Sequence, residues 1–239
     1  MQKEILPLQG YKTPAGTTVE LGLGPVAAAF PNGIFPTGAV HEFLSTGAEE
    51  AAATGGFVAG VLGGLMREKG VCIWIGCGRM LFPPALKLFG VEPDRVIFVD
   101  LKREKDGLWA MEEALKCEGL AAVVGELKEI DFTASRRLQL AVEQSRVTSF
   151  ILRPEPRKMN TTACVARWRI RPVSSALEQG MPGVGFPRWK VELLKIRNGR
   201  PGSWDLEWSA GGFKLLGLEE TSVSPQTLAR LSEEKRKTG

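Results

Sequence analysis

The chain has 239 residues, of which 44% are hydrophobic and 24% are charged, proportions typical of a globular domain that buries a core. Its most apolar stretch, residues 54–66, is shorter than the roughly 18 residues that a membrane span needs. No apolar block typical of an export signal follows the N-terminal residues. We therefore expect a cytoplasmic protein that does not cross a membrane.

The cysteines and the single histidine do not form a recognisable metal motif. Cys72, Cys77, Cys117 and Cys164 fall in segments that we predict to be in the core, and in a reducing compartment we expect buried thiols. Cys72 and Cys77 lack the spacing of a zinc or redox motif. His41 alone cannot supply a catalytic zinc site, and we expect it to be a core residue. We expect neither a metal nor another cofactor.

Charge is distributed unevenly along the chain. Residues 1–150 hold 15 Lys and Arg against 18 Asp and Glu, whereas residues 151–239 hold 16 against 9. The C-terminal part is therefore basic and could meet nucleic acid or an acidic protein. A solvated surface with scattered lysines explains the same asymmetry equally well.

In the first two thirds of the chain, segments with the hydrophobic pattern of a strand alternate with segments that have the pattern of a helix. Residues 1–35 are rich in turn formers, and we interpret them as an N-terminal arm on or beside the domain. Strands are predicted over residues 39–44, 71–75, 95–99, 120–125 and 147–152, and helices over 49–67, 82–89, 106–117 and 131–146. We expect Asp106 to cap its helix, and Phe132, Leu138, Leu140, Ala141 and Val142 to be available for the core. This alternation predicts a parallel sheet covered by helices.

The pattern changes after Arg153. Residues 164–171, 188–195 and 203–208 alternate with period two, and Asn198-Gly199 supplies a turn, so we expect antiparallel strands with one polar face. Residues 174–187 form a loop rich in glycine and proline. We divide the chain into the arm (1–35), a core (36–217, with a parallel part 36–152 and a basic antiparallel part 153–217) and a flexible tail (218–239).

A phosphate-binding loop is expected between the first strand and the first long helix, but its residues differ. Gly47 and Thr54 stand at the positions of the first glycine and the magnesium-binding hydroxyl of such a loop, whereas Ala52 and Ala53 replace the second glycine and the lysine. Two glutamates, Glu49 and Glu50, add negative charge where a polyanion would lie. A capped helix start with acidic residues near its positive end explains the same residues. Both interpretations make ATP binding and hydrolysis improbable.

Residues 69–92 resemble, without gaps, the segment of RecA-type recombinases that follows the phosphate-loop helix. Gly76 and Gly78 stand where recombinases carry an aspartate and the catalytic glutamate, and only Glu126 could replace the magnesium-binding aspartate of a later strand. The resemblance implies an α/β fold with a RecA-like three-layer core, whose mostly parallel sheet is extended by antiparallel C-terminal strands. It also implies a degenerate nucleotide site and no enzymatic activity.

Several further segments resemble the ImuA family, whose relatives include SulA-type division inhibitors. The most specific are the segments Trp-Ala-Met-Glu-Glu-Ala-Leu from residue 109 and Arg-Arg-Leu-Gln-Leu from residue 136. The resemblance implies an accessory factor for SOS-type error-prone translesion synthesis that binds an ImuB-like relative of Y-family polymerases. A RecA-type recombinase, an error-prone DnaE-type polymerase and single-stranded DNA are further candidate partners. A SulA-like inhibitor that binds a tubulin-like protein and an ATPase with an unusual phosphate loop are the alternatives.

Basic residues after residue 152 are the candidates for contact with DNA or an acidic partner. If the fold is RecA-like, the first of them fall just past a parallel strand, the usual edge for ligands. Three arginines alternate along one strand and share a face, and Trp189 could stack on bases. Alternatively, the arginines pair with Glu192 or Glu207 on a solvated face. The candidates are Arg153, Arg157, Lys158, Arg167, Arg169, Arg171, Arg188, Lys190, Lys195, Arg197 and Arg200.

Overall fold

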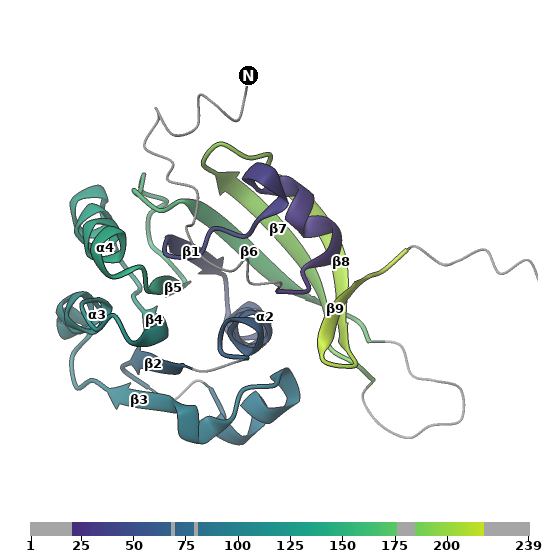
Figure 1. Cartoon of the computed structure of the whole chain (residues 1–239), viewed down its shortest axis with the longest axis horizontal. Coiled ribbons are helices and arrows are strands. Elements are labelled where there is room, and N and C mark those ends of the chain that lie inside the picture. The colour runs from purple at the N-terminus through teal and green to yellow at the C-terminus, as the bar shows by residue number, and fades with distance from the viewer. Residues whose placement is uncertain (1–20, 68–69, 79–80, 176–184, 218–239) are drawn as a thin grey trace, which may run out of the picture.

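The computed structural model describes residues 21–67, 70–78, 81–175 and 185–217, which share one sheet and its covering layers (Figure 1). The predicted tail, most of the loop at 174–187 and the first part of the predicted arm lie outside these residues. None of the described helices combines the length and the apolar character needed to cross a bilayer.

The described strands form a nine-stranded sheet in the order β3-β2-β4-β5-β1-β6-β7-β8-β9. Neighbours from β3 to β6 are parallel, and neighbours from β6 to β9 are antiparallel. The strand bounds are β1 Val40–Ser45, β2 Val71–Gly76, β3 Val96–Asp100, β4 Leu120–Glu126, β5 Thr148–Pro154, β6 Ala166–Val173, β7 Arg188–Ile196, β8 Gly202–Ser209 and β9 Gly212–Leu215. The predicted fold is therefore confirmed, with a mostly parallel sheet extended by antiparallel strands.

Helices cover both faces of this sheet and complete three layers (Figure 1). On one face α2 (Ala48–Leu65) packs against β6 and β1, beside the short helices η2 (Gly24–Ala29), η3 (Pro31–Gly33) and η4 (Pro83–Phe89). On the other face α3 (Gly107–Leu115) and α4 (Phe132–Ser145) lie next to each other. Two further short helices, η5 (Pro93–Arg95) and η6 (Glu104–Asp106), stand before β3 and α3.

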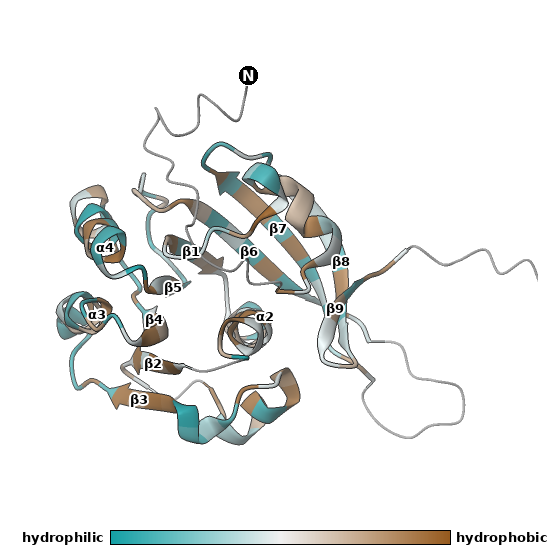
Figure 2. Ribbon diagram, in the orientation of Figure 1, coloured by the Kyte–Doolittle hydropathy of each residue, from teal (hydrophilic) through white to brown (hydrophobic). Residues whose placement is uncertain are grey.

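Strand parity explains why the sheet has two cores. Phe43 on β1 and Trp168 on β6 are register partners and stack, with ring centroids 5.9 Å apart, on the side of α2. Val40 and Ile151 face the other way and pack with α3 and α4. Beyond α4 no described helix covers β6 to β8 on that face, and these strands alternate between hydrophilic and hydrophobic residues along their length (Figure 2).

Strand β6 joins the parallel and the antiparallel parts of the sheet, and its antiparallel pairing with β7 confirms the prediction. Its residues pair in parallel with β1, and only β7, β8 and β9 continue as antiparallel neighbours. The parallel pairing with β1 results from the connection over residues 155–165, here called the return segment, which runs from the end of β5 back to the start of β6. The alternating pattern predicts a half-buried strand in either direction, so it cannot show this crossover.

Several predicted burial states also differ from the structure. Phe132 and Leu140 are exposed because they lie on the outer side of α4, and Cys77 and Cys117 are exposed rather than buried. The core includes Leu21 and further apolar residues of 21–35, so it extends into the predicted arm.

Two polar predictions have different outcomes. Asp106 makes no capping bond to α3, because its carboxylate pairs with Arg103 at 2.7 Å. His41 is the expected core histidine: its ring lies 2.7 Å from the Pro36 carbonyl oxygen and stacks on Phe35. Burial lowers the pKa of His41 to about 4, so the ring is neutral at physiological pH.

A candidate degenerate nucleotide site

The turn between β1 and α2 is occupied by a carboxylate of the chain itself. Glu50 Oε2 accepts hydrogen bonds from the Thr46 backbone N–H at 2.7 Å and from the Thr46 hydroxyl at 2.9 Å. The same oxygen lies 3.7 Å from Arg169 Nε of β6. Gly47 makes this turn possible, because its φ of 92° lies in a region that favours glycine. The two donor groups of Thr46 in this turn therefore already bind an anion.

The residues at the predicted lysine position and beside it carry no positive charge that could offset this carboxylate. Ala52 is exposed on the second turn of α2, whereas Ala53 and Thr54 are buried against the core. The Thr54 hydroxyl oxygen is buried and has no hydrogen-bond partner among the described residues. This hydroxyl is shielded from solvent and makes no hydrogen bond to the Thr46 groups that bind Glu50.

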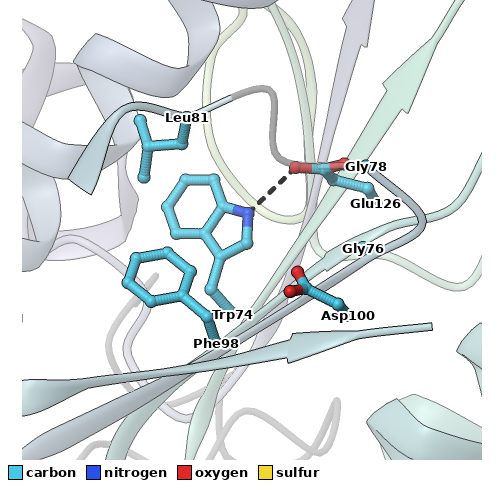
Figure 3. A pocket seen from close by; sticks show the side chains of 7 residues that line it. All are labelled: Trp74, Gly76, Gly78, Leu81, Phe98, Asp100 and Glu126. Carbon is cyan, nitrogen blue, oxygen red and sulfur yellow. Dashed lines mark hydrogen bonds between the residues drawn. The ribbon is translucent and has the colours of Figure 1, made fainter.

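A second part of the site lies at the carboxyl ends of β2, β3 and β4. Trp74, Leu81 and Phe98 form its apolar wall, and Glu126 and Asp100 lie on the side of the indole N–H group (Figure 3). Trp74 Nε1 donates to Glu126 Oε1 at 2.9 Å. A side chain at position 76 would bring its Cβ within 2.6 Å of Glu126 Oε2, so Gly76 leaves room for this carboxylate. Gly78 borders the hollow with open space around it.

The electrostatics of this hollow disfavour a polyanion. Burial raises the pKa of Glu126, and the Trp74 hydrogen bond opposes part of that rise. Burial, followed by the charges of Glu104, Glu126 and Asp106, raises the pKa of the neighbouring Cys77. The hollow has space for at most one water molecule. Within the described ranges no group of three or more His, Cys, Asp or Glu residues is arranged to hold a metal ion.

Arg153 is not available as a nucleic-acid ligand, because the structure places it in the core. Its side chain is 0% exposed and forms an ion pair with Glu42 at 2.7 Å, while Glu129 lies 3.5 Å away. It also donates to the carbonyl oxygens of Lys128 and Lys158. The sequence gives a partial signal for this cluster, since Glu42 is a charged residue inside an apolar strand, but it does not reveal the partner.

The three alternating arginines of β6 share a face, as predicted, yet each is paired with a glutamate. Arg167 Nε donates to Glu42 Oε2 at 2.8 Å, and its side chain is 14% exposed. Arg169 faces Glu50, and Arg171 pairs with Glu192 at 2.6 Å. On β7, Arg188 pairs with Glu207 at 2.8 Å. The pairs with Glu192 and Glu207 are those that the alternative predicted, whereas Arg167 is largely buried against Glu42.

The remaining candidates are exposed and are not part of any ion pair among the described residues. They comprise Arg157, Lys158, Lys190, Lys195, Arg197 and Arg200. Two of them contact the return segment at the β6 end: Lys195 lies 3.4 Å from the Thr162 carbonyl oxygen, and Arg197 lies 3.1 Å from that of Ala163. Arg157 and Lys158 belong to its opposite end, near β5. Exposed cations thus mark both ends of the return segment. Trp189, the predicted stacking residue, is buried.

Comparison of folds agrees with this topology. The crystal structure of the RadB recombinase superposes with a TM-score of 0.55 over 82% of this chain and 98% of that chain, at 12% sequence identity. At this identity the likeness shows the RecA-like fold alone.

Comparison of sequences identifies the relatives. No family model matches the chain. Protein ImuA of Caulobacter vibrioides strain NA1000 / CB15N is 36% identical over 215 residues, which cover 85% of this chain and 88% of that protein. Protein ImuA of strain ATCC 19089 / CIP 103742 / CB 15 gives the same values. With this identity over most of both chains, the protein belongs to the ImuA family.

Proposed function

We propose that this protein is a non-catalytic accessory factor in DNA damage tolerance, which acts by binding an ImuB-like relative of Y-family polymerases in error-prone translesion synthesis. Membership of the ImuA family supports the pathway. The observation that carries the non-catalytic part is the Glu50 carboxylate, which occupies the donors of the turn before α2. Glu126 adds a second carboxylate at the neighbouring strand ends.

We expect no catalysis because of the negative charge at the proposed site. Phosphoryl transfer needs cations that neutralise the β- and γ-phosphates and the developing charge on the transferred group. Here Ala53 replaces the lysine, and Glu50 and Glu126 would face the phosphates with negative charge. Calorimetric titration with Mg-ATP should give no saturable heat, while a recombinase with an intact phosphate loop serves as the positive control. Stoichiometric Mg-ATP binding would contradict the proposal.

Capture experiments test the partner. The full-length chain, used as bait, should retain a purified ImuB-like polymerase relative and should not retain a tubulin-like division protein. The opposite result would favour the division-inhibitor alternative. A RecA-type recombinase and an error-prone DnaE-type polymerase are further prey proteins in the same assay, since the proposed pathway includes both.

Contact with single-stranded DNA is a second candidate activity, favoured by the exposed cations at the two ends of the return segment. Cations outside ion pairs can release counterions from phosphates, whereas arginines held by glutamates cannot do so without losing their partners. Replacing Arg157 and Lys158 by alanine should therefore lower the salt slope of binding by about 0.7 per lost phosphate contact. The matched control replaces the exposed Lys102 and Lys105 by alanine. No measurable affinity of the unmodified chain at low salt would exclude the DNA activity.

A further inference from the structure

The hollow at the ends of β2, β3 and β4 has features of a cation site. Its wall is apolar and aromatic, formed by Trp74, Phe98 and Leu81, and the Glu126 carboxylate lies at the side of the indole N–H (Figure 3). Aromatic rings beside a carboxylate are the arrangement with which proteins bind ammonium groups. The hollow is open to the outside at Gly78, which is exposed and has no atom near its virtual Cβ.

Glu126 has an acceptor atom that its neighbours leave incompletely used. Within the described residues its only hydrogen-bond partner is the neutral Trp74 N–H group, and no cation pairs with it. Oε1 takes that bond, while Oε2 lies toward Gly76. A carboxylate that is mostly shielded from water and has no positive partner gains from an incoming cation.

The size of the hollow selects the kind of cation. Space for at most one water molecule fits a single ammonium group, whereas a planar guanidinium or a phosphate is too large. A divalent metal is disfavoured, because the described residues offer no cluster of three possible ligands. A lysine side chain places an ammonium group at the end of a flexible apolar stem, so the ammonium group can enter the hollow while the stem stays outside it.

We propose that this hollow binds the side chain of a lysine supplied by a protein partner. The inference rests on the proposed function, because that function requires the chain to hold another protein. The carboxyl edge of the sheet would then keep a binding role in which a protein ammonium group takes the place of a nucleotide. Glu126 would accept the hydrogen bond and the charge, and Trp74 would orient Glu126 through its indole N–H.

The test uses the uniformly ¹⁵N-labelled full-length chain and a probe of defined chemistry, Nα-acetyl-lysine methylamide. The Trp74 indole signal, assigned through the variant Trp74→Phe, should shift saturably with this probe. The norleucine analogue has nearly the same shape but no ammonium group, and it should leave the signal in place. Glu126→Gln keeps a carbonyl acceptor for Trp74 and removes the charge, so affinity for the lysine probe should fall about tenfold.

A second variant tests the site independently, in case Glu126→Gln fails to fold. Gly78→Leu adds a side chain at the open border of the hollow, where the virtual Cβ meets nothing within 4 Å, and it should block the probe without lowering the melting temperature. Absence of a saturable shift, an equal shift with the norleucine analogue, or unchanged affinity in Glu126→Gln would each overturn the inference. Partner capture separates the two proposals: a captured polymerase relative with no lysine binding rejects only the site, and lysine binding without capture rejects only the partner.

Discussion

Replacing Glu42 by glutamine should be among the most destabilising single-atom changes in this protein. Glu42 is fully buried, and its two carboxylate oxygens bind Arg153 at 2.7 Å, Arg167 at 2.8 Å and the Thr162 hydroxyl at 2.8 Å. These contacts join β1 to β5, to β6 and to the return segment. The amide keeps the size of the carboxylate and removes its charge, so packing hardly changes.

The magnitude follows from the state of Arg153. Without the Glu42 charge, its buried guanidinium keeps two carbonyl acceptors and Glu129, which is 3.5 Å away and 44% exposed. Removing one partner of a buried ion pair costs about 3–5 kcal/mol, because the other charge stays buried. For a chain of this length that corresponds to a fall in the melting temperature of about 10 °C.

The assay is urea unfolding followed by circular dichroism, with Glu192→Gln as the matched control. Glu192 makes a comparable arginine pair with Arg171, whose side chain is 44% exposed, so its loss should cost less than about 1 kcal/mol. If Glu42→Gln unfolds within about 1 kcal/mol of the unmodified chain, then the buried cluster does not stabilise the fold as argued here.

Three more outcomes are expected. A maleimide at neutral pH should label the exposed Cys117 and spare Cys72, since burial raises the pKa of Cys72 to about 12; mass spectrometry of peptides reads this out. Burial lowers the pKa of His41 to about 4, so the unfolded chain binds the proton first, and the free energy of unfolding should fall by at most about 1.4 kcal/mol per unit as pH decreases from about 6.5 toward about 5. Gly63→Ala should lower stability by about 1–3 kcal/mol, because the new Cβ would collide with the Phe89 carbonyl oxygen.

Each of these outcomes has its own control. Labelling of Cys72 as fast as that of Cys117 in the native chain would contradict its burial. His41→Gln should flatten the pH dependence between about 5 and 6.5, and an unchanged slope would assign it to other groups. Gly78→Ala, where a Cβ meets open space, should leave stability nearly unchanged, so an equal loss at both glycines would refute the steric argument.

Much of the fold could be predicted because its signals are local. Asp131 caps α4 through the Ala134 N–H at 2.7 Å, as the boundary of that amphipathic segment implies. The buried strand β2 follows from an uninterrupted apolar run between glycines. The parallel pairing of β6 with β1 and the strand β9 were not predictable in this way, because they depend on tertiary pairing and on a four-residue segment with little pattern of its own.

For the candidate site, too, local features could be predicted from the sequence and long-range contacts could not. Spacing predicts Gly47 and Glu50 at the turn before α2, where the structure has them, whereas Thr54 lies further along the helix and is buried. Spacing could not show that Glu50 would fold back onto Thr46, or that Arg153 would be neutralised by a residue 111 positions earlier in the chain. Long-range ion pairs depend on which strands become neighbours, and that information is absent from local patterns.

The carboxylate of Glu50 in the turn before α2 has a consequence for timing. A soluble nucleotide leaves its binding site when it is hydrolysed or when its concentration falls. In a recombinase core, the nucleotide-bound state therefore has a limited lifetime. Glu50 is part of the chain, so the hydrogen bonds that it makes to Thr46 do not depend on the concentration of a nucleotide. If the proposed function holds, we expect the lifetime of a complex made by this protein to be set by the dissociation rate of its partner and not by nucleotide hydrolysis.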